Sequence, residues 1–492
     1  MSSAAADLAA RQRRSGLTLA LLAFAQLIVS IDYNIVYVAL PEIGSGLGFS
    51  AQTLQWVVSA YAVAFGGFLL FGGRASDLFG RRRMFVLGLS LYAVSSLIGG
   101  LANTPALLVG ARAVQGLGGA FLFPATLALV VTSFSEGKER NRALSVWAAA
   151  GASGMVIGSL LGGVLTQAFG WQAVFYVNVP LAGGAALLAL SLITPDGARE
   201  KGRRFDLPGA LTATVGATLV VFTLVQAPES GWTSPLILTS AVVGLALVAA
   251  FIAIEARSSD PLMPLRLFRN PNLSTGVATT FLFMATFGTL LYFLTVYFQT
   301  VHGYSALETG IAFLIPMVAG FLGSMLGGRL ATRFGIRPTL IASFVIGGAG
   351  TLAMGLAMSP DGSYLALLPG LVVLSVCQGV IFTTMFAASS TGVHPYEQGI
   401  ASGIVSTGQQ VGSAVGLAVL VAIANSGTEG LTGEALRTAS NDGLRTAVFV
   451  ATVGIVLLVL VALNFKRAPQ AGAEPDADRQ AASAPVAEAV AS

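Results

Sequence analysis

Charged side chains are scarce in this chain. Only 10% of its 492 residues are Asp, Glu, Lys or Arg, whereas 55% are hydrophobic. Soluble domains carry about 25% charged residues, so this chain has too little polar surface to cover itself in water. Lipid is therefore the expected solvent for most of the sequence.

Cysteine and histidine are scarcer still, which excludes several kinds of site. The single cysteine, Cys377, cannot form an intramolecular disulfide, and its apolar surroundings favour a packing role. The two histidines, His302 and His394, lie outside the apolar runs and are expected to be solvated. No P-loop, H-E-x-x-H motif or nucleophile elbow occurs. We therefore expect no enzyme, no bound metal, no cofactor and no ATP-driven domain.

Long apolar runs are the main feature that is present. About 20 apolar residues suffice for a helix to cross the hydrocarbon core of a bilayer. The first run lacks a small-residue cleavage site and is interpreted as a retained first span. The sequence predicts an all-α integral membrane protein with about fourteen transmembrane helices. The expected spans are 17–40, 52–72, 84–102, 105–131, 143–165, 172–193, 208–226, 235–254, 273–298, 309–330, 338–358, 364–388, 399–424 and 444–465.

Polar segments divide these spans into groups. The last segment is rich in Ala, Pro and acidic residues and has too little apolar surface to fold, so it is expected to be disordered. The predicted division is an N-terminal segment at 1–16, a six-helix bundle at 17–193, linkers with two additional helices at 194–272, a second six-helix bundle at 273–467 and a tail at 468–492.

Basic residues gather on alternate connections between the spans. Nearly all of the 26 Lys and Arg residues do so; the exceptions are Arg437 and Arg445, expected in one loop, and Arg112 inside an apolar run. This pattern follows the positive-inside rule and predicts that both termini are cytoplasmic. The net charge of +4 thus reflects topology rather than a nucleic-acid partner. Preference for Arg over Lys, with much Ala and Gly, is typical of high-GC bacteria and suggests a bacterial plasma membrane.

An internal sequence repeat suggests two related halves. GGRASDLFGRRRMF begins at Gly72 and GGRLATRFGIRPTL begins at Gly327, with Gly, Gly, Arg, Phe, Gly and Arg in register. The offset places the first span on the ninth, so a six-helix unit is repeated around an inserted pair. Parallel repeats of this kind occur in secondary transporters, whose substrates bind between the halves.

Several motifs resemble those of the major facilitator superfamily and, within it, the fourteen-span drug:proton antiporter family. GRASDLFGRRR from Gly73 resembles the cytoplasmic signature G-x-L-A-D-x-x-G-R-R/K, with Ala75 where Leu is usual. IDYNIVYVALP from Ile31 is similar to LDxTIVNVALP. The pattern L-x-x-x-R-x-x-Q-G is matched by Leu108, Arg112, Gln115 and Gly116, and the pattern W-x-x-x-F-x-x-N-x-P by Trp171, Phe175, Asn178 and Pro180.

The fifth span carries the family's antiporter signature with one departure. In G-x-x-x-G-P-x-x-G-G the proline is replaced by Ser159, and the glycines are Gly154, Gly158, Gly162 and Gly163. The resemblance implies the major facilitator fold and export of small amphiphilic compounds in exchange for protons. Because the proline is missing, proton-coupled uptake of a small metabolite remains the alternative. A receptor or membrane enzyme is a weaker alternative that would require clustered histidines and acids.

Two ionisable residues lie deep within expected spans. An ionised Asp32 would be poorly solvated there, so it can take up a proton, whereas Arg112 cannot lose its charge and needs a partner. We expect the two to face a common central cavity and to interact in one conformational state. The alternatives are a structural hydrogen-bonding role for Asp32 and an Arg112 that only pins its span to neighbouring carbonyls.

The remaining candidate residues concern gating, packing and substrate. In the loop after the second span, Asp77 and Arg81 are four residues apart and would approach if the loop were helical; Asp77 would then latch the halves beside a helix N-terminus. The alternative is that the arginines only set topology. Gating is assigned to Gly73, Asp77, Gly80 and Arg81, and close helix packing to Gly154, Gly158, Gly162 and Gly163.

Aromatic and amide groups in otherwise apolar spans are the candidates for substrate contact. A cavity of this character suits planar or lipophilic molecules. The candidates are Asn34, Tyr37, Tyr61, Gln115, Phe287, Tyr292 and Gln378. Any one of them could instead be a core or lipid-facing residue. We expect a monomer whose partners are this small-molecule substrate and the bilayer.

Overall fold

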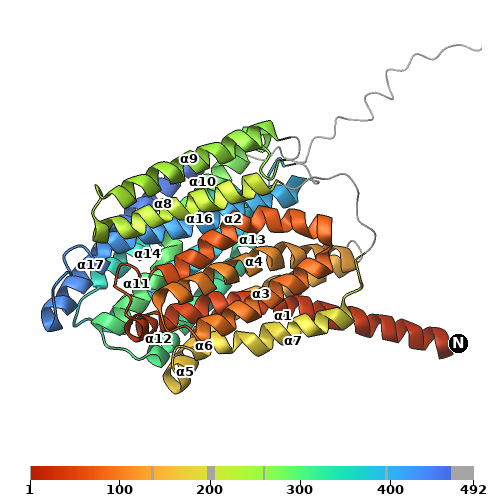
Figure 1. The fold of residues 1–492 in the computed structure, drawn as a ribbon, viewed down its shortest axis with the longest axis horizontal. Helices are drawn as coiled ribbons and strands as arrows, with labels where there is room; N and C mark the ends of the chain where they lie inside the picture. The colour runs from red at the N-terminus through yellow and green to blue at the C-terminus, as the bar shows by residue number, and fades with distance from the viewer. Residues whose placement is uncertain are drawn as a thin grey trace, which may run out of the picture.

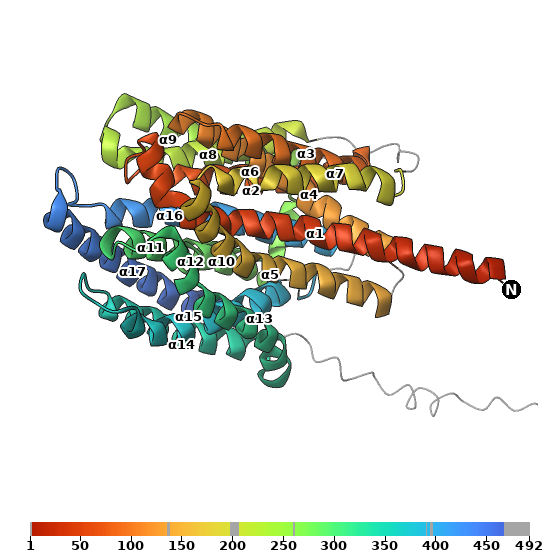
Figure 2. The same cartoon turned by 90° about the horizontal axis from the view of Figure 1, so that it is seen from below.

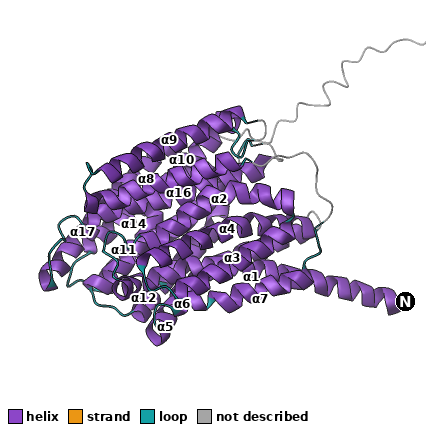
Figure 3. Cartoon of the chain, in the orientation of Figure 1, coloured by secondary structure: helices purple, strands orange, loops and turns teal. Residues whose placement is uncertain are grey.

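The computed structural model describes residues 2–134, 138–196, 206–258, 261–389, 391–393 and 397–466, and all regular secondary structure in these ranges is helical (Figures 1 and 3). Thirteen helices in the described ranges are long and apolar enough to cross a membrane. The further helix α2 (Trp56–Phe79) has a shorter apolar stretch, Trp56–Leu69. The predicted all-helical fold is confirmed, with thirteen to fourteen spans where about fourteen were expected.

The helices follow one another as alternating spans. The first half contains α1 (Ser2–Leu47), α2, α3 (Arg81–Gly100), α4 (Pro105–Ser133), α5 (Lys138–Phe169), the short α6 (Ala173–Tyr176) and α7 (Asn178–Leu192). The inserted pair is α8 (Leu207–Ser230) and α9 (Pro235–Arg257). After η1 (Leu265–Arg269), one span combines α10 (Pro271–Thr286), η2 (Phe287–Thr289), α11 (Leu290–Val296) and η3 (Tyr297–Val301). The last spans are α12 (Ala306–Ala312) with α13 (Leu314–Phe334), then α14 (Ile336–Ala357), α15 (Tyr364–Ser389), α16 (Gln398–Ala424) and α17 (Gly433–Ala462).

Short polar caps fix where several spans begin. Thr104 accepts a hydrogen bond from the N–H of Leu107 at the start of α4, and Asp206 accepts one from Gly209 at the start of α8. Ser305 and Glu308 form a capping box that starts α12. Such caps satisfy backbone donors that lack partners in the first helical turn.

The helices lie side by side, and the first turns of α1 project beyond the bundle (Figures 1 and 2). The inserted α8 and α9 pack together, and α8 also contacts α2 and α16. Because successive spans alternate in direction, the α2–α3 turn lies at the same end as the N-terminus. We call this the basic end, after Arg74, Arg81, Arg82 and Arg83. The other is the opposite end.

The two halves share the turn that their repeated sequences predict. Gly80 separates α2 from α3 with φ 105° and ψ 139°, and Gly335 separates α13 from α14 with φ 88° and ψ 153°. Positive φ favours glycine, which has no Cβ. The break also bears on Asp77 and Arg81: α2 ends at Phe79 and α3 begins at Arg81, so the continuous helix on which their expected approach depended does not form.

Two further local predictions need correction. Arg437 and Arg445 lie in α17, which begins at Gly433, rather than in a loop. Helix α1 runs on to Leu47, through Pro41, beyond the expected end of the first span at residue 40. In both cases the helix is longer than the apolar run, at its start in α17 and at its end in α1, because a helix can continue into the interface with water. The division into domains stays a prediction, and the tail at 468–492 lies outside the described residues.

The glycines of α5 lie against neighbouring backbone. A Cβ on Gly158 would lie 2.6 Å from the carbonyl oxygen of Ile31, and one on Gly162 would lie 2.8 Å from that of Ile35. A Cβ on Gly154 would lie 2.6 Å from the Cβ of Ser30, also on α1. Contacts this close are possible only without a side chain. On its other side α5 meets the second half of the chain, where a Cβ on Gly163 would lie 2.7 Å from the carbonyl oxygen of Ala306.

Candidate functional site

Asp32 is completely buried in the middle of α1 and accepts hydrogen bonds from four side chains. Its Oδ2 is 2.8 Å from Nη1 of Arg112 on α4 and 3.1 Å from the hydroxyl of Tyr92 on α3. Its Oδ1 is 2.8 Å from Nε2 of Gln115 and 2.8 Å from Nδ2 of Asn178 on α7. Four helices of the first half therefore converge on one carboxylate.

Arg112, only 2% exposed, is held by more than its ion pair. Its Nε donates to the carbonyl oxygen of Val57 at 2.9 Å, and Nη1 also donates to Oε1 of Gln115 at 2.6 Å. Its guanidinium carbon lies 4.6 Å from the ring centroid of Tyr61. A buried ion pair is stable only when such additional contacts offset the loss of water. The site thus combines the two roles considered for Arg112, pairing with Asp32 and binding a neighbouring carbonyl.

The predicted substrate contacts fall into separate places. Tyr61 and Gln115 lie beside the ion pair, whereas Asn34 donates to the carbonyl oxygen of Ser30 and lies where α1 meets α5. The other four candidates lie in or against one hydrophobic cluster shared by both halves. Tyr37, Phe287 and Tyr292 belong to this cluster. Gln378 lies beside it, and its Nε2 donates to the carbonyl oxygen of Phe287 at 3.1 Å.

Three polar residues at the site were not predicted as members of it. Asn178 was noticed only as part of a motif, and nothing in the sequence distinguishes Tyr92 or Ser96. Ser96 accepts a hydrogen bond from Gln115 at 2.9 Å and so fixes the amide that faces Asp32. A motif signal for Asn178 existed, but uncharged polar residues are too common in spans to be recognised individually.

A row of aromatic rings leads from the ion pair toward the basic end. Tyr61 stacks on Phe65 with centroids 5.8 Å apart, Phe65 meets Phe123 at 6.2 Å, and Phe123 meets Trp147 at 5.6 Å. Within the described residues, the Nε1 atom of Trp147 is buried and has no hydrogen-bond partner. Sequence analysis missed this row, because its members come from α2, α4 and α5.

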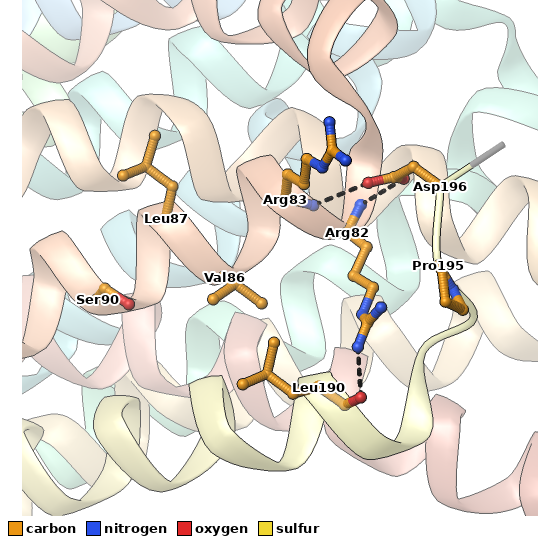
Figure 4. A pocket seen from close by; sticks show the side chains of 8 residues that line it. All are labelled: Arg82, Arg83, Val86, Leu87, Ser90, Leu190, Pro195 and Asp196. Carbon is orange, nitrogen blue, oxygen red and sulfur yellow. Dashed lines mark hydrogen bonds between the residues drawn. The ribbon is translucent and has the colours of Figure 1, made fainter. Parts of the chain in front are cut away.

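The signature turn is the turn at Gly80 between α2 and α3, within the sequence that resembles the cytoplasmic signature. Here the carboxylate beside a helix N-terminus is that of Asp196, a residue that was not predicted. Its Oδ1 accepts from the N–H of Arg82 at 3.0 Å and its Oδ2 from the N–H of Arg83 at 3.1 Å (Figure 4). A Cβ on Gly80 would collide with it, whereas Gly73 has open space apart from Pro124 at 3.8 Å. The side chain of Asp77 lies outside what the structure describes.

Histidines are the last sequence-predicted residues to be located, together with any possible metal ligands. His302 is half-buried rather than solvated, and its ring centroid lies 4.6 Å from that of Tyr297. Burial lowers the pKa of His302 below its ordinary value. His394 lies outside the described residues. No group of three or more potential metal ligands occurs in the described part of the chain.

Comparison with known proteins agrees with this architecture. The Major Facilitator Superfamily profile matches residues 22–417. The cephamycin export protein CmcT of Amycolatopsis lactamdurans is 38% identical, over 89% of this chain and 91% of its own length. The puromycin resistance protein pur8 of Streptomyces alboniger is 38% identical, over 82% of this chain and 80% of its own length.

A solved structure shares the fold at low identity. The nucleoside transporter NupG superposes with a TM-score of 0.65 at 14% identity, covering 92% of this chain and all of that one. This likeness concerns the fold alone, whereas the profile match and the relatives extend over most of the sequence. The chain belongs to the Major Facilitator Superfamily, and it is a multi-pass membrane transporter rather than an enzyme.

Proposed function

We propose that this chain exports small amphiphilic compounds, such as antibiotics or other drugs, in exchange for protons. The basic end faces the cytoplasm of a bacterium, both termini lie there, and the chain works as a monomer. Support for export comes from the relatives, one named for cephamycin export and another for puromycin resistance. The proton is the coupling ion, and no other cofactor takes part.

The Asp32–Arg112 pair is the observation that carries the coupling scheme. All four side chains that contact Asp32 donate to it, and a carboxylate has lone pairs for all of them. Withdrawal of Arg112 would leave a buried carboxylate without its countercharge, and a proton would then replace the lost positive charge. Protonation thus follows conformation, because one movement exchanges Arg112 for a proton.

Contacts between the halves suggest which conformation is present. A Cβ on Gly310 would lie 2.7 Å from the carbonyl oxygen of Ser159, and Nε2 of Gln299 donates to the carbonyl oxygen of Val38 at 2.7 Å. Both contacts lie toward the opposite end. We infer a state closed at that end. Rocking of the halves would part these contacts and open the transporter there.

Close approach at Ser159 also bears on the missing proline. Its carbonyl faces Gly310, and its hydroxyl donates to the carbonyl oxygen of Met155 in its own helix at 3.3 Å. The contact between the halves is therefore made by backbone and glycine, neither of which requires proline at position 159. For this reason we favour export over uptake.

The aromatic row indicates the substrate class. Rings of Tyr61, Phe65, Phe123 and Trp147 offer stacking surfaces, and the unpaired Nε1 atom of Trp147 offers one donor. A planar, lipophilic molecule with an acceptor group matches this combination. Near the signature turn, Gly73, Asp77, Gly80 and Arg81 are proposed to gate entry from the cytoplasm.

Everted vesicles test direction and energy source together. Everted membrane vesicles that contain this protein should accumulate a planar fluorescent drug when a pH gradient, acidic inside, is imposed. An uncoupler should abolish the accumulation. Asp32→Asn should remove gradient-driven accumulation while membrane insertion stays normal, because Asn cannot exchange a proton. Glu434→Gln, at an exposed carboxyl, is the matched control and should transport normally. Unchanged gradient-driven transport by Asp32→Asn would refute the coupling scheme, and accumulation only in right-side-out vesicles would favour uptake.

A further inference from the structure

A cavity of about 530 Å³ lies at the basic end, between α3 and the end of α7, away from the Asp32 site (Figure 4). Its polar side is formed by Arg82, Arg83 and Asp196. Val86, Leu87 and Leu190 form much of its apolar side. The cavity thus joins charged groups near the helix ends to apolar groups farther into the spans.

The charge of this cavity is incompletely matched. Arg82 donates from Nη2 to the carbonyl oxygen of Leu190, but its Nε atom is buried and has no hydrogen-bond partner among the described residues. Asp196 does not supply that partner, since both its oxygens accept from backbone N–H groups. A buried charged donor without an acceptor is costly, so an acceptor entering the cavity would be bound favourably.

The apolar side belongs to the surface that faces lipid. Leu87 is 39% exposed and Leu190 is 54% exposed, and both lie on helices that span the membrane. A small hydrophilic anion could use the arginines but would leave these leucines without a partner. A molecule that combines an anionic head with a hydrocarbon chain would satisfy both sides at once.

We propose that this cavity binds an anionic phospholipid. The phosphate oxygens accept from the guanidinium of Arg82, Arg83 adds a second positive charge at the rim, and one acyl chain lies along Val86, Leu87 and Leu190. Arginine is well suited to phosphate because its planar fork carries several donors. Basic pockets between helices at the cytoplasmic side are sites where anionic headgroups bind. A zwitterionic lipid also has a phosphate, but its ammonium group would bring a further positive charge next to two arginines.

The second half of the chain provides a matched control. Arg337 occupies the position equivalent to Arg82, two residues after the turn glycine Gly335, but Pro338 stands in place of Arg83. After its glycine the second turn therefore has one arginine, whereas the first has three, Arg81, Arg82 and Arg83. Substitution of Arg337 removes the same charge from the same kind of turn without touching the cavity.

Native mass spectrometry of the full chain in detergent tests the site. Phosphatidylglycerol should be retained as a bound adduct, and phosphatidylcholine at equal concentration should not. Loss of both arginines in Arg82→Gln/Arg83→Gln should weaken phosphatidylglycerol binding by roughly tenfold or more, whereas Arg337→Gln should leave it unchanged. Equal binding by the double variant, or equal retention of the two lipids, would overturn the proposal.

A third ligand separates a lipid site from a plain anion site. Glycerophosphoglycerol carries the same headgroup without acyl chains and should not be retained at the lipid's concentration. Should it bind as tightly as the lipid and depend on the same arginines, the lipid assignment is wrong. If the double variant fails to fold, Arg83→Gln alone serves, because that side chain is exposed; it should still weaken phosphatidylglycerol binding, and unchanged binding would count against the proposal.

Discussion

Asn178 at the start of α7 donates from Nδ2 to Oδ1 of Asp32 on α1 at 2.8 Å, across 146 residues of sequence. The same amide nitrogen lies 3.3 Å from the carbonyl oxygen of Val174 in the preceding turn. One side chain therefore ties the carboxylate to the junction of α6 and α7. Asn178 is a positioning residue for the buried carboxylate, besides the arginine that neutralises it.

Replacing Asn178 by Leu should impair both stability and coupling. Leucine has a similar volume but cannot donate, so Oδ1 of Asp32 loses one partner at a cost of about 1–3 kcal/mol. We expect a lower thermal unfolding midpoint and slower gradient-driven efflux. Asn464→Leu is the matched control, since Asn464 is exposed and its amide donates to the carbonyl oxygens of Leu460 and Val461 at the end of α17, away from Asp32. Efflux by Asn178→Leu at the wild-type rate, with the wild-type dependence on the pH gradient, would show that Asn178 does not position Asp32.

Replacing Arg112 by Lys should fail although the charge is kept. A lysine ammonium is a single point and cannot reach the carbonyl of Val57 while also binding Asp32 and Gln115 as the guanidinium does. We expect efflux in vesicles to fall by roughly tenfold or more, from the loss of charge-assisted hydrogen bonds. Arg445→Lys is a suitable control because Arg445 also bonds a backbone carbonyl, that of Gly355, but far from the site. Full activity of Arg112→Lys would mean that charge alone suffices.

Replacing Gly158 by Ala should separate α5 from α1. The added methyl group would lie 2.6 Å from the carbonyl oxygen of Ile31, closer than real Cβ atoms come to such a neighbour. Relief requires a backbone shift costing about 1–3 kcal/mol, seen as a lower unfolding midpoint in detergent. At Gly110 on α4 nothing lies within 4 Å of an added Cβ, so Gly110→Ala should be neutral or slightly stabilising. Equal midpoints for the two variants would contradict close packing at Gly158.

His302 should make the folded protein less stable at mildly acidic pH. Burial lowers its pKa; nearby Arg437 lowers it further, while Asp361 and a hydrogen bond with Ser359 oppose the shift. The unfolded chain therefore binds the proton more readily than the folded protein does. The contribution of neutral His302 to the stability of the folded protein is complete above the ordinary pKa of about 6.5. That contribution declines as the pH falls toward the lowered value.

Unfolding midpoints between pH 7.5 and pH 5 check this effect. His302→Phe keeps a ring against Tyr297 but cannot be protonated, so its midpoint should fall less on acidification than that of the wild type. Identical pH profiles would show that His302 contributes nothing to the acid sensitivity of the fold.

The candidate site illustrates what could be predicted from sequence and what could not. Asp32 and Arg112 were recognisable because an ionisable residue is rare within an apolar run, so each one stands out individually. Tyr92 contributes a similar contact, but tyrosine is common in spans and its partner lies 60 residues away. Its role depends on how α3 packs against α1, which no local pattern reveals.

The signature turn shows the same limit in another way. Its sequence predicted a turn between two spans, and the positive φ of Gly80 and Gly335 agrees with that. The partnership of Asp77 with Arg81 was expected only if this loop were helical, and that condition is not met, because α2 ends at Phe79 and α3 begins after Gly80. The acid that does lie at the start of α3 is Asp196, which comes from a segment recognised only as a polar linker.

Composition and periodicity by themselves determined that this chain enters lipid and roughly where each span lies, because transfer of an apolar segment into a bilayer depends on that segment alone. Tertiary structure decided which polar groups meet, which glycines face a neighbouring backbone and where a charged cavity opens. Those properties depend on distances between helices that are far apart in sequence. A buried carboxylate can be recognised from its own surroundings along the chain, but its four donors are assembled only when α1, α3, α4 and α7 pack together.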